Sequence, residues 1–597
     1  MSRSNAPLRS FDKGSSRCPF FFLRSIPYSI AASVLLTSIA AWAQVIPEPA
    51  TGRIKREPLT AQRHMIVAAH PLASAAGFDI LERGGSAIDA AIAAQMVLNV
   101  VEPQSSGVGG GAFLLHYSAR DRRLQIFDGR ETAPKAATPA LFLDRDGKPL
   151  RFFSAVVGGR AVGTPGVVPM LEMAHRDLPG RLPWANLFTA AIAHAEDGFD
   201  VSPRLNALIS RDRFLREDPG ASAIFFSDAG QPLPVGARLR NPPLAASLRA
   251  IAAEGAKALR TGPIAEDIVK AVRNHPTNPG TLSLADLDGF KPRTRVPLCA
   301  PYRAWRVCGV PPPSAGGITV LQILKLLEER NIGALAPESL IAAHLFSEAG
   351  RLAYADRNAF IADPDFVAVP VLQMLAPRYL AQRAAMIDPR RSMGTAQAGQ
   401  LARFDRVRID AEEVPATTHL SVIDAEGNAV ALSSSIENAF GARMMVRGFM
   451  LNNQLTDFSF APEEAGTRVA NRVEGGKRPR SSMAPTMVFD RDGRLILMIG
   501  SPGGAWIINF VARALVATLD WGLDLQAAFE LPHYGSRNGP TELERGTSAE
   551  GLREGLERLG HTVQVIDMPS GLHGIQRLSD GWLGAADPRR EGVARGR

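Results

Sequence analysis

The apolar residues of this chain recur with two different periods. Between Gly85 and Pro103, from about residue 165 to 290 and again over 338–361, they return every three or four positions, which predicts amphipathic or buried helices. The first of these is an alanine-rich run that we expect to begin after the glycine and to end before the proline, because such residues mark helix boundaries.

Strand-like alternation with a period of two is found in three other segments, 113–130, 418–435 and 486–504. Each has a charged or Asp/Gly turn near its middle, so each predicts a β-hairpin. A helical pattern over 506–519 follows the last hairpin directly. This order, mostly helices first, then hairpins and then a helix again, predicts a layered α+β domain in which helices cover the sheets.

Composition agrees with a globular protein. The chain has 597 residues, of which 46% are apolar and 21% are charged, which excludes a disordered or collagen-like chain. This length requires either several domains or one large layered core. No repeat of solenoid period is present, and no low-complexity tract lies outside the termini.

The N-terminal segment predicts a targeting signal. Five basic residues precede an apolar run that starts at Ile30 and ends in Ala41-Trp42-Ala43, the pattern of a secretory signal peptide over 1–43. The run is short of the roughly 20 residues that a membrane span needs, so no stable membrane insertion is expected. An uncleaved signal anchor is the alternative. A periplasmic or secreted protein is the expectation.

Removing 1–43 takes away five basic residues and one acidic residue, so the net charge falls from +8 to +4. No long Lys/Arg block remains, and no nucleic-acid partner is expected. Cys18 leaves with the signal, whereas Cys299 and Cys308 flank a turn-like segment. They could form a disulfide in an oxidising compartment or remain as two buried thiols. No CxxC pair and no His-x-x-x-His spacing is present, so no metal site is expected.

Thr417 carries the candidate chemistry. If the bond between Ala416 and Thr417 were cut, the threonine would acquire an α-amine beside its own hydroxyl. Such an amine, with a pKa of about 7.7–8.0, can accept the hydroxyl proton near neutral pH, so nucleophile and base would share one residue. The alternative is an ordinary β-branched residue at the start of a strand.

Other segments offer groups that would suit this nucleophile. Gly503 and Gly504 follow a strand and precede a helix, where backbone amides can hold an oxyanion; a tight turn is the simpler interpretation. Arg130, which follows a strand, could bind a carboxylate through two parallel hydrogen bonds. Two short polar windows complete the set, with Ser481 and Ser482 in one and Gln454 and Asp457 in the other.

Several features favour simpler interpretations. "GVGGGA" (107–112) precedes a strand rather than a helix, so we interpret it as a turn and not as a dinucleotide fingerprint. His419 shares a strand face with Thr417 and could act as a base, but a packed structural histidine is the preferred interpretation. Asp587 is expected to form a turn. No G-x-S-x-G motif surrounds the hydroxyl residues, so an α/β-hydrolase is not indicated.

Taken in order, "GGSAIDAAIAAQMVLNVVEPQSSGVGGGAF", "DGRETAP", "PPPSAGGI", "EAGRLAYADRNAFIADPDF", "TTHLSV", "MLNNQLTDFS", "GKRPRSSMAPT" and "GSPGG" resemble the γ-glutamyltransferase family. The motifs run from about residue 60 to 590. The resemblance implies an α+β fold, the αββα sandwich of N-terminal nucleophile hydrolases. It also implies a proenzyme that cuts itself into a large subunit, 44–416, and a small subunit, 417–597, which stay paired.

The resemblance also implies roles for individual residues, with no cofactor. Thr417 would be the nucleophile, Ser435 the hydroxyl that hydrogen-bonds it, and Gly503 and Gly504 the oxyanion hole. The glutamyl carboxylate would be held by Arg130, Ser481 and Ser482, and the glutamyl ammonium by Gln454 and Asp457. A zwitterionic head group needs such opposite ends. The implied reaction cleaves the γ-glutamyl amide of glutathione and related donors through a threonyl ester, which passes to water, an amino acid or a dipeptide.

Two differences from the family's sequence pattern leave the substrate undetermined. Glu437 stands where the best-known members carry asparagine, and the segment between Asp457 and Ser481 is short beside members that have a lid loop. Glu437 can still accept a hydrogen bond from the substrate ammonium, although its added charge could alter affinity or substrate range, and the short segment would suit a more open site. A glutaryl or cephalosporin-type acylase of the same family is therefore one alternative, and a non-catalytic secreted binding protein is another.

Overall fold

The computed structural model describes residues 52–401 and 416–597. The predicted signal segment 1–43 lies outside the described residues, and the predicted cleavage site at Ala416 lies within them. The chain is continuous through Ala416 and Thr417 in this structure, so the geometry below is that of the uncut protein.

Two seven-stranded antiparallel sheets form the centre of the described chain. The first sheet has the strand order β1 (Leu59–Ala61), β22 (Trp582–Ala586), β21 (His573–Arg577), β17 (Leu495–Gly500), β16 (Thr486–Phe489), β9 (Trp305–Gly309) and β8 (Leu298–Tyr302). The second has the order β23 (Val593–Gly596), β2 (Met65–Ala68), β10 (Thr418–Ile423), β11 (Ala429–Ser435), β3 (Gly111–Ser118), β4 (Arg123–Asp128) and β7 (Arg293–Arg295). All three predicted hairpins are confirmed as β3–β4, β10–β11 and β16–β17.

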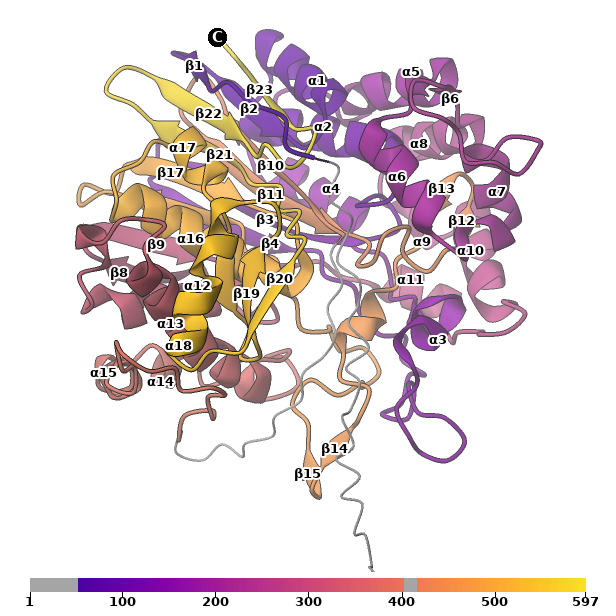
Figure 1. Ribbon diagram of the computed structural model, residues 1–597. Coiled ribbons are helices and arrows are strands. Elements are labelled where there is room, and N and C mark those ends of the chain that lie inside the picture. The colour runs from indigo at the N-terminus through magenta and orange to yellow at the C-terminus, as the bar shows by residue number, and fades with distance from the viewer. Residues whose placement is uncertain (1–51, 402–415) are drawn as a thin grey trace, which may run out of the picture. The chain divides into compact units, whose positions relative to one another are not determined.

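Helices cover the outer face of each sheet, which confirms the αββα arrangement (Figure 1). The second sheet packs against α1 (Pro71–Glu82) and α2 (Ala87–Val101), and the first against α12 (Gly316–Glu328) and α16 (Ile507–Leu519), with α13 (Leu340–Phe360) behind them. The two-residue alternation of β10 explains this layering, because Leu420 and Val422 enter the helix-side core while Ile423 enters the core between the sheets.

Local sequence signals account for the helix boundaries. Ser86 caps α2, with its hydroxyl and the Asp89 carboxylate forming a reciprocal capping box, an arrangement that satisfies otherwise unpaired amides. The helical prediction for 165–290 is confirmed by α4 (Val167–Asp177), α5 (Thr189–Asp197), α6 (Pro203–Arg211), α7 (Pro219–Phe225), α8 (Pro242–Glu254), α9 (Lys257–Arg260), α10 (Pro263–Arg273) and α11 (Leu284–Gly289).

Strands from both sides of Thr417 are mixed within both sheets. In the second sheet β10 lies between β2 and β11, and β11 pairs in turn with β3. In the first sheet β22 pairs with β1 and β16 pairs with β9. Figure 1 shows this mixing as indigo strands beside orange and yellow ones. The two parts of the chain therefore share one pair of sheets rather than forming separate domains.

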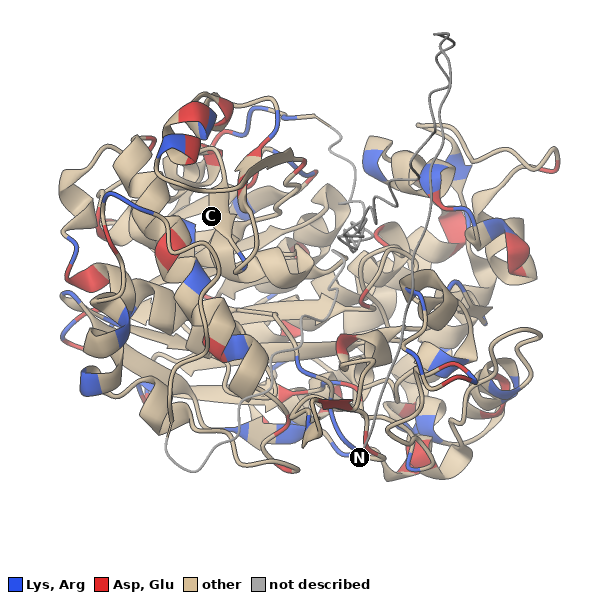
Figure 2. Cartoon of the chain, turned by 60° about the horizontal axis from the view of Figure 1, so that its bottom comes forward, with Lys and Arg blue, Asp and Glu red and all other residues tan. Residues whose placement is uncertain are grey.

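Cys299 and Cys308 are joined in a disulfide, opposite each other on β8 and β9, so the structure selects this one of the two alternatives. Basic and acidic residues are interspersed over the surface elements (Figure 2). Within 52–401 and 416–597, no helix combines the length and the apolar character needed to cross a membrane.

Candidate active site

Thr417 and Ser435 face each other at adjoining ends of β10 and β11. The register pairs Thr418 with Ser434, so the next step along the hairpin brings these two hydroxyl residues together. The Thr417 hydroxyl lies 3.1 Å from the Ser435 hydroxyl and 2.8 Å from the carbonyl oxygen of Ala416. Ser435 donates to that same carbonyl oxygen at 2.7 Å. The nucleophile predicted from sequence is thus in contact with the bond that it is predicted to cut.

A cavity opens beside this pair. It is lined by Thr417, Ser435, Glu437, Gln454, Asp457, Ser481, Ser482, Met483, Gly504 and Ile507. Eight of these are predicted site residues, although they come from five separate sequence segments. Met483 and Ile507 were not predicted, since an apolar side chain carries no signal that distinguishes a cavity wall from a core position.

Glu437 is held in an unusual backbone conformation. Its φ of +77° lies in the region that residues other than glycine rarely adopt, and its amide donates to the Ser435 hydroxyl at 2.9 Å. The carboxylate accepts hydrogen bonds from the Asn453 side-chain amide and, at 3.5 Å, from the Thr456 hydroxyl. Backbone strain of this kind is typical of functional sites, where neighbouring contacts compensate for it.

Arg130 occupies a different place from the one expected. It is fully buried and does not line the cavity; instead its guanidinium pairs with the Asp457 carboxylate and donates to the Arg480 carbonyl oxygen at 2.9 Å. Two residues predicted to bind opposite ends of a substrate head group are therefore paired with each other. One guanidinium nitrogen, Nη1, has no hydrogen-bond partner among the described residues.

Glu131 lies on the other side of this arginine, with its carboxyl 3.6 Å from Arg130 Nη1. Burial raises the pKa of the Glu131 carboxyl to about 8, and the neighbouring arginine only partly opposes this effect. The close approach of Gly111, where an added Cβ would meet the carboxyl at 2.2 Å, encloses the group. Near neutral pH it is largely a neutral acid.

The two predicted serines lie on one wall of the cavity. Ser482 accepts a hydrogen bond from Arg357 at 2.6 Å, and the Ser481 hydroxyl accepts one from the Met483 amide at 3.1 Å. The backbone of Ser481 is fixed by bonds with Pro313 and Ala315. Arg357 supports the cavity wall through this bond to Ser482, and sequence reasoning missed it because its partner lies 125 positions away.

The two glycines predicted for the oxyanion hole lie between β17 and α16. Gly503 and Gly504 have φ values of +139° and +55°, a conformation that favours glycine. Gly504 lines the cavity with Thr417, whereas Gly503 lies one position behind it. An added Cβ at Gly503 would meet the Phe510 ring at 2.6 Å, so this turn has no space for a larger residue.

The interpretation of His419 as structural is supported. Its ring is buried between the Ser433 hydroxyl at 2.8 Å and the Ser421 hydroxyl at 3.2 Å, and burial lowers its pKa well below the usual value. The glycine-rich segment 107–112 leads directly into β3, as expected for a turn. Asp587 does more than form a turn: it is buried and accepts hydrogen bonds from Ser570, Leu572 and Arg589.

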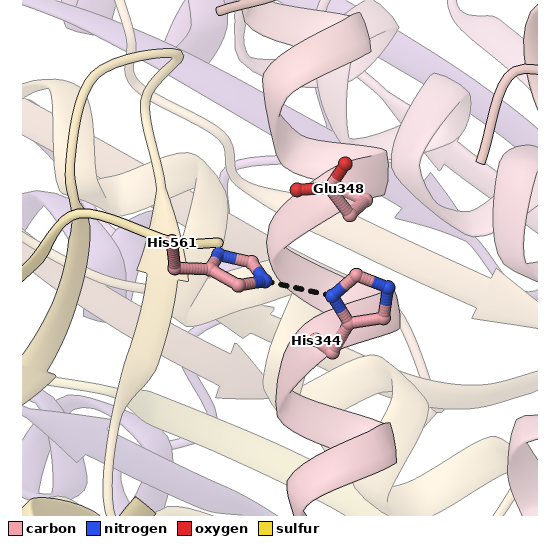
Figure 3. Close-up of side chains that lie close together, drawn as sticks. All are labelled: His344, Glu348 and His561. Carbon is pink, nitrogen blue, oxygen red and sulfur yellow. Dashed lines mark hydrogen bonds between the residues drawn. The ribbon is translucent and has the colours of Figure 1, made fainter. Parts of the chain in front are cut away.

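One cluster of potential metal ligands lies outside the cavity. His344 and Glu348, four residues apart on α13, meet His561 (Figure 3). His344 Nε2 bonds the Asp388 carbonyl, which can only accept, so His344 Nδ1 accepts from His561 Nε2 at 2.7 Å. His561 Nδ1 is then free to accept from Thr541 and Arg351.

Glu348 in this cluster accepts from Arg351, Ser392 and the Met393 amide. Every potential ligand atom of the cluster therefore already takes part in a hydrogen bond. The positively charged Arg351 side chain bonds to Glu348 and His561, so it would repel a metal ion at this position. The side-chain chemistry favours a structural hydrogen-bonded network over a metal centre.

Comparisons with known proteins agree with this geometry. Two shared sheets covered by helices, with a threonine at the start of a central strand, define the class of N-terminal nucleophile hydrolases. The sequence profile described as Gamma-glutamyltranspeptidase matches residues 73–596. The chain belongs to this family.

Individual relatives span more than one activity. The glutathione hydrolase proenzyme of Bacillus subtilis (strain 168) is 35% identical over 89% of this chain and 91% of its own length. Acylase ACY 1 proenzyme of Pseudomonas sp. (strain V22) is 36% identical over 92% and 96%. Among solved structures, cephalosporin acylase from Bacillus halodurans matches with a TM-score of 0.79 at 26% identity, over 93% of this chain and 99% of that one.

Proposed function

We propose that this protein is a self-processing γ-glutamyl acyltransferase and hydrolase whose nucleophile is Thr417. One observation carries the proposal: the Thr417 hydroxyl lies 2.8 Å from the Ala416 carbonyl oxygen, at the edge of a cavity lined by the residues that a glutamyl head group requires. Glutathione hydrolase relatives at about one third identity support it.

Maturation would begin with an N-to-O acyl shift. Thr417 Oγ attacks the Ala416 carbonyl carbon, and the Ser435 hydroxyl stabilises the charge that develops on the carbonyl oxygen. The peptide C–N bond breaks as an ester forms to Thr417 Oγ, and the nitrogen takes the hydroxyl proton. Water then hydrolyses this ester. The products are a large subunit ending at Ala416 and a small subunit that begins with the free amine of Thr417.

Turnover would repeat the same chemistry on a substrate. The α-amine accepts the hydroxyl proton while Oγ attacks the γ-amide carbonyl, and the Gly503 and Gly504 amides hold the oxyanion. The leaving amine takes that proton, and water or an acceptor amine cleaves the resulting γ-glutamyl ester. Ser481, Ser482 and Arg130 would bind the donor carboxylate. For the arginine this requires Nη1, which lies near Glu131 but makes no hydrogen bond among the described residues, or separation from Asp457.

Glu437, Gln454 and Asp457 would bind the donor ammonium. All three line the cavity, and two of them carry a carboxylate that suits a cation. The proposal is tested by N-terminal sequencing of the small fragment and by release of p-nitroaniline from γ-glutamyl-p-nitroanilide. We expect a fragment that begins Thr-Thr-His, and an uncut, inactive Thr417→Ala variant. An uncut wild-type chain that still hydrolyses the amide would refute the proposal.

A glutaryl or cephalosporin-type acylase is the second candidate. The Acylase ACY 1 and cephalosporin acylase similarities favour it, as does the pairing of Asp457 with Arg130, because a glutaryl group has no ammonium for Asp457 to bind. Comparing kcat/KM for γ-glutamyl and glutaryl p-nitroanilides decides between the two, and a clear glutaryl preference would favour the acylase.

We also propose the location and the first processing step. The basic start, short apolar run and Ala-Trp-Ala sequence of residues 1–43 support a cleaved secretory signal and a periplasmic or secreted enzyme. Cell fractionation with mass measurement of the large subunit tests this. A mature large subunit should begin at Gln44.

A further inference from the structure

The C-terminal segment 587–591 passes behind the nucleophile. Arg590 in this segment is buried, and its guanidinium is fixed on one side by the carbonyl oxygen of Pro569, to which Nε and Nη2 donate at 3.3 and 3.2 Å. The remaining nitrogen, Nη1, donates to the carbonyl oxygen of Thr417 at 3.4 Å. A planar guanidinium held at two points can direct its third nitrogen accurately.

The turn that holds Arg590 also contacts the oxyanion loop. An added Cβ at Gly571 would meet the Arg590 side chain at 2.6 Å and Pro502 at 2.7 Å. The Gly571 amide donates to the Ser501 hydroxyl at 3.2 Å. Ser501 and Pro502 directly precede Gly503, so a continuous series of contacts runs from the oxyanion loop through Gly571 and Arg590 to Thr417.

Glu591, the residue after Arg590, is linked by polar contacts to Thr418. Glu591 accepts from the Arg204 amide at 3.1 Å, and the Arg204 side chain pairs with the buried Glu102 at 3.0 Å. Glu102 in turn accepts from the Thr418 hydroxyl at 3.2 Å. Thr417 and Thr418 are therefore both restrained by polar contacts from this C-terminal segment. Arg590 contacts Thr417 directly, whereas Glu591 acts on Thr418 indirectly, through Arg204 and Glu102.

We propose that Arg590 is a positioning residue that fixes Thr417 relative to the oxyanion glycines and keeps the amine of the mature enzyme neutral through its adjacent positive charge. This inference rests on the proposed function. A newly cut chain end would otherwise be free to move, and a hydrogen bond to its own carbonyl restrains it without blocking the hydroxyl or the amine.

The positive charge of Arg590 should lower the pKa of the Thr417 amine in the mature enzyme. A nearby cation disfavours protonation of an amine and so lowers its pKa. Among the described residues, the other charged or titratable groups around Thr417 are Glu437 and Asp457 across the cavity, Glu102 behind Thr418, and His419 further along β10; Arg56, His573 and Glu591 lie beside Arg590. The carboxylates act in the opposite direction to the guanidinium, so removing the guanidinium should leave an amine that protonates at higher pH.

The test uses processed enzyme and γ-glutamyl-p-nitroanilide. For Arg590→Met we expect kcat to fall about 10- to 100-fold with KM within about 2-fold, as for an interaction that matters in the transition state. The midpoint of the acidic limb of kcat should rise by about one pH unit. Arg590→Lys keeps the charge but cannot span both carbonyls, so its kcat should fall while the midpoint stays in place.

Arg577→Met is the matched control, because Arg577 also donates to a backbone carbonyl, that of Leu495 at 2.8 Å, on a sheet strand away from the cavity. It should leave both readouts unchanged. A processed Arg590→Met enzyme with wild-type kcat and midpoint would overturn the proposal.

If the methionine variant does not fold, the lysine variant decides the question, since a wild-type kcat in Arg590→Lys overturns the positioning role. Failure of the wild-type chain to cut itself would instead refute the proposed function and is seen on the same denaturing gel.

Discussion

The Ser435 hydroxyl donates to the Ala416 carbonyl oxygen at 2.7 Å while lying 3.1 Å from the Thr417 hydroxyl. One side chain thus contacts both the attacking group and the group under attack. It can steady the charge on the carbonyl oxygen during maturation and orient the nucleophile afterwards.

Removing this hydroxyl should slow maturation. For Ser435→Ala we expect self-cleavage to be slower by about 10²- to 10³-fold, the usual cost of deleting one oxyanion donor. Ser435→Thr keeps the hydroxyl and should cut at nearly the wild-type rate. Following the two fragments on a denaturing gel over time measures both variants. Equal rates for alanine and wild type would show that the contact has no role in cleavage.

Glu437 should discriminate between donors. Its carboxylate lines the cavity, and a charge-assisted hydrogen bond to an ammonium contributes about 1.5–3 kcal/mol. Glu437→Gln keeps an oxygen for Asn453 but removes the charge, so KM for γ-glutamyl-p-nitroanilide should rise about 10- to 100-fold. KM for the glutaryl analogue, which has no ammonium, should change little. Equal changes for both substrates would place the ammonium elsewhere.

Glu131 should make the protein less stable as the pH rises from 5 to 8. Because its folded pKa of about 8 lies above the ordinary 4.5, the folded chain binds the proton that the unfolded chain releases. Stability is then lost as pH rises, by about 3 kcal/mol between pH 5 and 8. Glu131→Gln cannot ionise, so its melting temperature should fall less over this range. Parallel profiles for the two proteins would contradict this.

His561 should make the protein less stable as the pH falls from 7 to 5. Burial and the Arg351 charge lower its folded pKa to about 3, below the ordinary 6.5, so the unfolded chain takes up a proton that the folded chain does not. Stability should fall by about 2 kcal/mol as pH drops from 7 to 5. His561→Gln should be less stable at pH 7 but should have a flatter acid profile. If the stability of His561→Gln depended on pH as steeply as that of the wild type, the ring would have to take up its proton as readily in the folded protein as in the unfolded chain.

Much of the fold follows from local pattern. The helix from Ala87 to Val101 and the hairpin across Thr418–Ser435 were predictable because burial on one face imposes periods of 3.6 and 2 on the sequence. The αββα layering needed the family resemblance as well, since periodicity shows which residues are buried but not which sheet they join.

The site was predictable where residue types carry their own chemistry. Eight of the cavity residues could be named beforehand, yet the pairing of Arg130 with Asp457 could not, because it joins positions 327 residues apart. The same holds for Arg357 beside Ser482 and for His561 beside His344. A local sequence pattern does not indicate contacts between distant residues, because these contacts form only when the layers of the fold pack together.

The mixing of strands from before and after Ala416 has a consequence for the lifetime of the protein. A break at that position would leave the first piece with gaps in both sheets and the second piece with a gap in one, and each piece alone would present bare strand edges that promote aggregation. We therefore expect the uncut chain to fold before it is cleaved. Once the cleaved protein is denatured, we do not expect its two pieces to refold into the native structure. The durability of the mature form would be set by how slowly it unfolds and not by an equilibrium with its unfolded pieces.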